Sequence, residues 1–286
     1  MAQVFFPIKF KYNLMSNSKN ISTLFFSSQV EFLKDSFIIN DKALFSKFSE
    51  AVQKFCFFIF EIDKLIDGDY QFENLYSKEH NVLYNLTKNH QESIKLLLDI
   101  FPKEHPFWED LDQTNFRYYQ ILLKEKQFNK TRERISNVDF EDYADAKHAL
   151  AYIPIRGMKY LFESKIETHM LEDLFANIFK AMQMNDDLED FDADERSGQW
   201  TFVHSEVQNF MTENDLDENS NLEKFRERVL YVSGIGEKLT YYAKEKFLSA
   251  KNSAEKFQLK NLTLWLDNAV DMMESNQQLI SKLTSK

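Results

Sequence analysis

Glycine and proline are scarce in this sequence of 286 residues, which holds five glycines and four prolines. Sandwiches, propellers and barrels need one of the two at many turns, and nucleotide-binding sheets need a glycine-rich phosphate loop. The scarcity argues against all of these folds and favours long helices joined by few loops. A chain of this length is expected to form one large domain or two modest ones.

Basic residues are outnumbered, because 35 Lys and Arg stand against 46 Asp and Glu, a net charge of −11. Such a surface repels polyanions, so we expect no nucleic-acid partner. The single cysteine, Cys56, cannot form a disulfide within the chain, which is typical of a cytoplasmic protein. The apolar run around it, Phe55–Phe60, is far shorter than the roughly 20 residues of a membrane span, and the N-terminus lacks the apolar core of a signal peptide.

Aromatic residues are abundant, with 28 Phe, 12 Tyr and 3 Trp. One interpretation is an apolar pocket whose ring faces stabilise a cation. The other is a core that simply uses phenylalanine as its main hydrophobic residue. Composition leaves both interpretations open.

Apolar residues recur every three or four positions through most of the chain, which predicts helices. The first helix can start after Asp41, a good N-cap, and end at Gly68. Breaks inside helical patterns are expected at Pro154–Gly157 and Ser233–Gly236. We expect a single all-α domain over 1–286 with roughly eight to ten helices, residues 1–39 remaining unassigned. The further helical patterns cover 72–100, 107–130, 139–162, 168–195, 221–250 and 256–283.

The densest chemical feature is an acidic stretch in which Asp186, Asp190 and Asp194 recur every four residues. On one helix each would be offset by about 40° from the last, so their carboxylates would form a stripe. Such a stripe can bind Mg²⁺, although a solvated acidic face has the same pattern. Asp187 and Asp192 lie off the stripe, where we expect them to support the ligands from behind or to face solvent.

A second acidic pair, Asp63 and Asp67, lies four residues apart at the end of the first predicted helix. Taken alone, the pair also suits an exposed helix end. Two carboxylate groups on facing helices of a bundle can, however, hold metal ions between them. The two acidic segments together therefore predict a metal site that binds a diphosphate.

Three segments resemble the class I isoprenoid synthases, a superfamily that includes squalene and phytoene synthases and terpene synthases. Asp63-x-x-x-Asp67 resembles the reduced first motif of squalene and phytoene synthases, and Gln183-x-x-Asp186-Asp187-x-x-Asp190 resembles the second motif of chain-elongating enzymes. Tyr143-x-x-x-Lys147 is similar to a diphosphate-contacting stretch of the latter. The sequence departs from the pattern at Lys64, where many relatives have an aspartate, and it lacks a Gly-Lys-Arg stretch for a second substrate.

The resemblance implies an all-α helical bundle with a central active-site cavity, and it assigns roles to individual residues. The catalytic carboxylates would be Asp63, Asp67, Asp186 and Asp190. About three Mg²⁺ ions, or Mn²⁺ in their place, would bind carboxylate and phosphate oxygens at these four residues and Asp194. Cationic contacts to the diphosphate would come from Lys147, Arg156 and Arg196. The pocket would be lined by Phe57, Phe60, Tyr143, Phe179 and Gln183.

The function that the resemblance implies is that of a Mg²⁺-dependent terpene synthase, which ionises an allylic prenyl diphosphate and releases pyrophosphate. This reaction is preferred because the sequence has motifs for one allylic substrate and none for a second. Head-to-head coupling of two prenyl diphosphates is an alternative. A non-catalytic subunit that binds prenyl diphosphate is another, and the family implies a homodimer.

Overall fold

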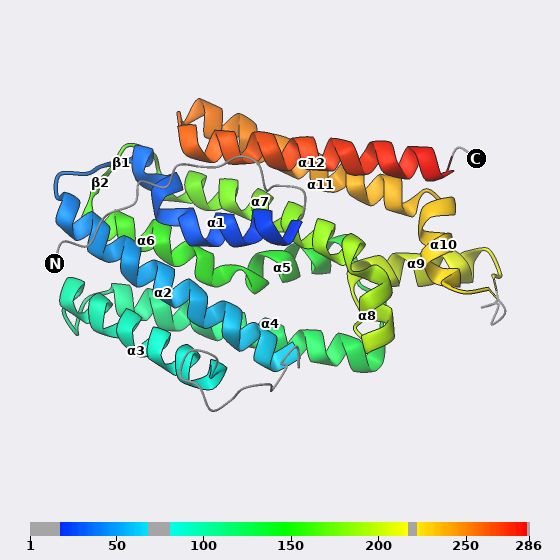
Figure 1. Ribbon diagram of the computed structural model, residues 1–286, viewed down its shortest axis with the longest axis horizontal. Helices are drawn as coiled ribbons and strands as arrows, with labels where there is room; N and C mark the ends of the chain where they lie inside the picture. Colours follow the sequence, from blue (N-terminus) through cyan, green and yellow to red (C-terminus); the bar gives the residue numbers. More distant parts are fainter. Residues whose placement is uncertain (1–17, 68–80, 217–221, 285–286) are drawn as a thin grey trace.

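The computed structural model describes residues 18–67, 81–216 and 222–284 and is almost entirely helical in these ranges (Figure 1). The all-α class is therefore confirmed. The α-helices are α1 (Ser18–Leu33), α2 (Lys42–Asp67), α3 (Val82–Ile100), α4 (Phe107–Thr131), α5 (Asn137–Lys147), α6 (Ile153–Leu161), α7 (Thr168–Glu189), α8 (Phe191–Ser197), α9 (Phe202–Glu213), α10 (Phe225–Val232), α11 (Ile235–Lys256) and α12 (Lys260–Thr284). Two 3₁₀ turns, η1 (Lys34–Ser36) and η2 (Ala149–Tyr152), and two short strands, β1 (Phe37–Ile38) and β2 (Glu163–Ser164), complete these ranges.

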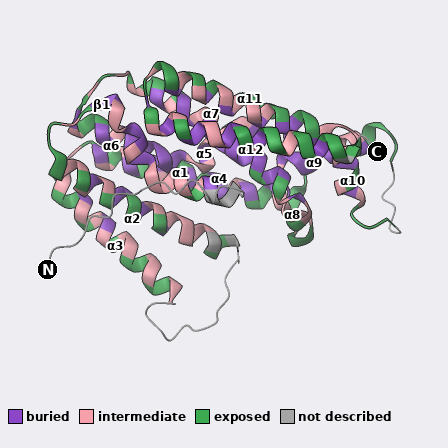
Figure 2. Ribbon diagram, turned by 45° about the horizontal axis from the view of Figure 1, so that its top comes forward, coloured by how far each residue is buried: buried purple, intermediate pink, exposed green. Residues whose placement is uncertain are grey.

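The helices pack as a bundle around α7. The long helices α11 and α12 pack against each other, and α11 also packs along α7. On the other side α2 packs against α3, and α1 contacts α2, α6, α7 and α12. Buried residues follow the inner faces of the helices, as Figure 2 shows for α5 and α7. Strands β1 and β2 pair antiparallel, with Phe37 opposite Ser164. None of the helices in the described ranges combines the length and apolar character needed to cross a bilayer.

Helix α2 begins where its sequence predicts. The Asp41 carboxylate accepts hydrogen bonds from the backbone N–H groups of Ala43 and Leu44, both at 2.9 Å, and so caps the first turn. The helix runs to Asp67, and Gly68, at which the sequence predicts its end, lies outside the described residues. Its buried face includes Phe48 and Val52, which come from the predicted apolar stripe.

The break expected at Pro154–Gly157 lies earlier in the chain. Helix α5 ends at Lys147, and η2 follows before α6 begins. Pro154 stands in the first turn of α6, where a missing N–H costs no helical hydrogen bond. Gly157 lies inside α6, where a Cβ atom would come within 2.3 Å of the Phe48 ring. Its role is to allow close packing, not to break the helix.

The acidic stretch also differs from the single helix expected over 168–195. Helix α7 ends at Glu189, and Asp190 stands at the junction with α8, with φ −91° and ψ 6°. Gly198 ends α8 in the left-handed region at φ +82°. Gly234 takes the same φ before α11, which confirms the break predicted near Ser233–Gly236.

Two helices lie in segments to which the sequence assigned no structure. Helix α1 occupies the unassigned N-terminal region and buries Phe25 and Phe32. Helix α9 is capped by Thr201, whose hydroxyl lies 2.9 Å from Nδ1 of His204.

Candidate active site

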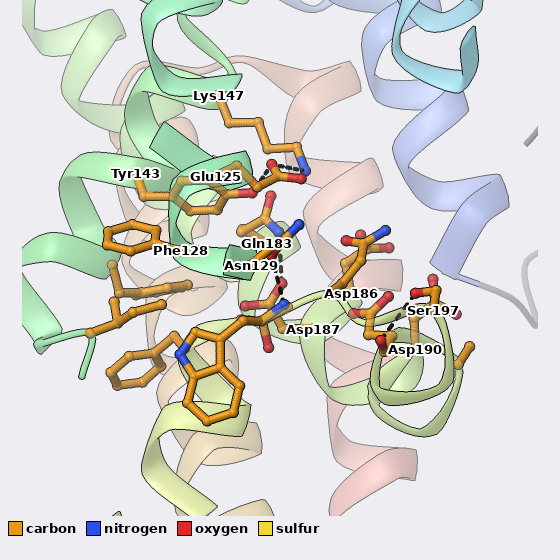
Figure 3. Close-up of a pocket in the computed structure, with 18 of the residues that line it drawn as sticks. Glu125, Phe128, Asn129, Tyr143, Lys147, Gln183, Asp186, Asp187, Asp190 and Ser197 are labelled. Carbon is orange, nitrogen blue, oxygen red and sulfur yellow. Dashed lines mark hydrogen bonds and ion pairs between the residues drawn. The ribbon is translucent and has the colours of Figure 1, made fainter. Parts of the chain in front are cut away.

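A cavity of about 440 Å³ lies where α2, α4, α5, α7 and α8 meet (Figure 3). Glu125 belongs to α4, Lys147 to α5 and Asp186 to α7, so the site is assembled from segments far apart in the sequence. Of the site residues predicted from sequence, the cavity gathers Asp63, Tyr143, Lys147, Gln183, Asp186, Asp190 and Asp194.

The lining of this cavity is strongly acidic. Among the described residues around it, Lys147 is the one basic side chain. The carboxyl groups are those of Asp63, Glu125, Asp186, Asp187, Asp190 and Asp194. Such an excess of negative groups attracts cations and repels a bare diphosphate.

The pKa of Asp194 shows that the carboxylates lie close together. Burial, together with the negative charges of the neighbouring Asp190 and Asp186, raises the pKa of its carboxyl to about 7. A proton shared among close carboxylates is the state that a divalent cation replaces. The electrostatics of Asp186, Asp190 and Asp194 therefore fit a metal ion.

Asp187 differs from the expectation, which placed it behind the ligands or facing solvent. It lines the cavity and is only 4% exposed. Gln183 Nε2 donates a hydrogen bond to its Oδ1 at 2.8 Å, whereas Oδ2 has no partner among the described residues. Burial raises the pKa of Asp187 well above its usual value. Asp187 thus lies in the cavity wall, because α7 turns its side chain inward.

Lys147 is held by a buried partner that the sequence analysis missed. Its Nζ lies 3.3 Å from Oε2 of Glu125, which is 6% exposed, and Tyr143 donates a hydrogen bond to the same oxygen at 2.7 Å. Burial alone would lower the pKa of Lys147, but Tyr143, Glu125 and Asp63 outweigh it and raise the pKa. Glu125 stands between Lys124 and Lys126, so in the sequence it resembles part of a solvated charged face.

The carboxylates on the two sides of the cavity could share a metal with a phosphate ligand. No group of three or more His, Cys, Asp or Glu side chains forms a ready metal site within the described ranges. Mg²⁺ usually takes one or two carboxylates and fills its octahedron with water and substrate phosphate, so it does not require such a group. Asp63 and the α7–α8 aspartates can supply those oxygens. Asp67 ends α2, but its side chain lies outside the described residues.

A second, apolar cavity of about 100 Å³ adjoins the acidic one. Asp63 and Lys147 line both cavities, and the Tyr118 hydroxyl donates to Asp63 Oδ1 at 3.3 Å. The remaining walls come mainly from α1, α2 and η2, and include Phe26, Phe55, Ile59, Phe60, Leu150 and Ala151. Phe60 therefore lies at an apolar pocket.

Four other predicted site residues line neither cavity. Phe57 is 42% exposed on α2, and Phe179 is fully buried in the core. Arg156 points to a surface groove, where its Nε lies 2.9 Å from Glu172 Oε1. Arg196 forms an exposed ion pair with Asp192 at 2.9 Å, because α8 turns it away from Asp194.

Comparison with known proteins assigns no family to the chain. No protein-family model matches it, and a search of curated proteins finds no match.

Proposed function

We propose that the protein is a Mg²⁺-dependent terpene synthase with a helical bundle of the isoprenoid synthase type. The observation that carries the proposal is the position of Asp63 and Lys147 in the walls of both cavities. A molecule with a highly charged head and an apolar tail would have its head in the acidic cavity and its tail in the apolar one. An allylic prenyl diphosphate has this form.

The acidic cavity suits a diphosphate only together with cations. Its lining carries several carboxylates and one lysine, so a diphosphate alone would be repelled. Asp63 on α2 and Asp186, Asp190 and Asp194 on α7 and α8 would hold the metal. When bound, Mg²⁺ would neutralise the charge that develops on the leaving pyrophosphate.

The side chains around the metal ligands also favour the departure of pyrophosphate. Lys147 donates charge-assisted hydrogen bonds to phosphoryl oxygens from the junction of the cavities, while Glu125 and Tyr143 hold its position. Burial raises the pKa of Asp187, which favours its protonated form over a further negative charge beside the diphosphate. Tyr118 orients Asp63 through its hydroxyl group.

The apolar cavity could stabilise the carbocation that ionisation produces and shield it from water. Ring faces such as those of Phe26, Phe55 and Phe60 stabilise positive charge, and the apolar walls exclude water. A cation that forms between the two cavities can therefore lose a proton or rearrange before water reaches it. This supports a synthase over a hydrolase.

The test is pyrophosphate release from prenyl diphosphates with and without Mg²⁺, with product analysis by mass spectrometry. Asp186→Asn is expected to reduce Mg²⁺-dependent release by at least about 100-fold. Asp192→Asn is the matched control, since Asp192 lies in the same acidic stretch but pairs with Arg196 and Lys224 at the surface. Its rate should equal that of the wild type.

Two results would contradict this proposal. Binding of a non-hydrolysable prenyl diphosphate analogue with Mg²⁺ but without release from any substrate would support a non-catalytic binding subunit. A product with a doubled carbon chain would support head-to-head coupling.

A further inference from the structure

Helix α1 forms part of the apolar cavity, although its segment of the sequence carries none of the recognised motifs. Phe26 and Gln29 on this helix line the cavity beside Phe55 and Phe60 of α2. The Phe26 ring lies edge-on to Phe60, with centroids 5.4 Å apart. It also stacks parallel on the ring of His148, at 5.6 Å.

His148 gives this stack a defined orientation. Its Nδ1 lies 2.7 Å from the carbonyl oxygen of Ala144, so an Nδ1–H tautomer donates there and the ring is held in place. Burial lowers the pKa of His148 to about 4. The imidazole is therefore neutral at physiological pH, which suits a wall of an apolar pocket.

Behind Phe26 the protein is filled. Its ring centroid lies 5.3 Å from that of Phe25 and 6.5 Å from that of Phe179, and both of these side chains are fully buried. Phe179 in turn stacks on His148 at 5.0 Å. The Phe26 ring thus stands between the cavity and the close-packed core.

The volume limits what the apolar cavity can hold. An apolar cavity of about 150 Å³ accepts one benzene molecule, which has six carbons. The cavity here measures about 100 Å³, which on the same scale holds about four carbons, so a single five-carbon isoprene unit already fills it. The carbons next to the diphosphate would lie at the junction formed by Asp63 and Lys147, outside this volume.

We propose that α1, through Phe26, limits the substrate to an allylic diphosphate of at most two isoprene units. This inference rests on the proposed function, which places the diphosphate in the acidic cavity. The first isoprene unit lies at the junction and the second fills the apolar cavity. A third unit, as in farnesyl diphosphate, would have to displace the Phe26 ring.

The experiment measures kcat/KM for pyrophosphate release from dimethylallyl, geranyl, farnesyl and geranylgeranyl diphosphates. Binding of the corresponding non-hydrolysable thiolodiphosphates with Mg²⁺ is measured in parallel by calorimetry. The wild type should prefer geranyl over farnesyl diphosphate by at least about 100-fold. Phe26→Ala should reduce this preference by about 10-fold or more, because it opens space for the third unit. Phe26→Trp should lower kcat/KM for geranyl diphosphate and leave kcat/KM for dimethylallyl diphosphate unchanged.

A matched pair of milder substitutions separates a size limit from general loosening of α1. Phe26→Leu removes ring volume at the cavity, whereas Phe32→Leu removes the same volume from a buried site on the same helix that does not line it. Phe26→Leu should shift the preference toward farnesyl diphosphate and Phe32→Leu should not. This pair also replaces Phe26→Ala if that variant fails to fold.

The outcomes distinguish this inference from the proposed function. Equal turnover or equal binding of geranyl and farnesyl compounds by the wild type would overturn the size limit, as would equal shifts in the two leucine variants. If no diphosphate is ionised but the thiolodiphosphates bind in the predicted order of length, catalysis fails and the size limit stands.

Discussion

The ammonium group of Lys147 lies 3.3 Å from the carboxylate of Glu125 in the wall of the acidic cavity. Glu125 is only 6% exposed, so water stabilises its charge little. This lysine and a hydrogen bond from Tyr143 stabilise the charge instead. Removing one partner of a buried pair leaves the other charge uncompensated, at a cost of about 3 kcal/mol. Lys147→Met should therefore lower the free energy of unfolding by about this amount in urea denaturation.

The double variant Lys147→Met with Glu125→Gln provides the control for this pair. It removes both charges, so most of the lost stability should return. If the double variant is as unstable as Lys147→Met alone, the loss comes from packing and the interpretation of the pair is wrong.

Asp194 should make the stability of the metal-free protein depend on pH. Its pKa is about 7 in the folded state, whereas an unfolded aspartate has a pKa of about 3.9. Between these values the folded protein binds more protons, so the contribution of Asp194 to the free energy of unfolding falls as pH rises. Asp194→Asn should remove this contribution, so the variant should gain stability relative to the wild type between about pH 4 and pH 7.

Mg²⁺ should reverse that effect, because the metal must displace the proton of Asp194 at low pH. The rise in thermal unfolding temperature on addition of Mg²⁺ should thus be larger at about pH 8 than at about pH 6. An equal rise at both values, or an unchanged pH dependence in Asp194→Asn, would contradict the assignment of Asp194 as a ligand.

Gly157 should resist replacement although it lies inside a helix. Alanine in place of glycine would by itself stabilise α6 by about 1 kcal/mol. A Cβ atom there would lie 2.3 Å from the fully buried ring of Phe48, and such overpacking costs about 1–3 kcal/mol. We expect the overpacking to dominate, with a lower unfolding temperature for Gly157→Ala.

The control for Gly157→Ala is a smaller side chain at Phe48, the residue that the new methyl group would contact. Phe48→Leu in the same chain should recover part of the loss, because leucine leaves room for the new methyl group. Phe48→Leu alone should destabilise through a cavity. Additive losses in the double variant would show that the two residues do not interact.

Gln29 should be replaceable with a gain in stability. It is 1% exposed, and its Nε2 has no hydrogen-bond partner among the described residues. Burial raises the pKa of the Cys56 thiol to about 12, so the thiol keeps its proton and donates weakly to Gln29 Oε1 at 3.9 Å. Gln29→Leu should raise the free energy of unfolding by about 1 kcal/mol, since an unsatisfied buried donor is removed.

Gln183→Leu is the matched control for Gln29→Leu. Gln183 is equally buried, but its amide donates to Asp187 at 2.8 Å. This substitution should destabilise the protein by about 1–2 kcal/mol. Destabilisation by both changes would show that the Gln29 amide has a partner in the folded protein.

The sequence by itself determined the all-α class and the course of the helices with strong local signals. Asp41 caps α2, and apolar periodicity defines most of α4 and α12, because capping and periodicity act within a few residues. The four-residue spacing of Asp186, Asp190 and Asp194 predicted that their carboxylates lie together, and the resemblance at Tyr143-x-x-x-Lys147 singled out Lys147. All four residues line the acidic cavity.

Only the tertiary structure decided which of these faces meet. The position of Gly157 against Phe48, the inward turn of Asp187 and the pairing of Glu125 with Lys147 each involve segments that local patterns cannot place together. The same holds for α1, whose Phe26 lines the apolar cavity together with residues of α2 and η2. Helix periodicity specifies which residues share a face, but packing between distant helices specifies what that face contacts.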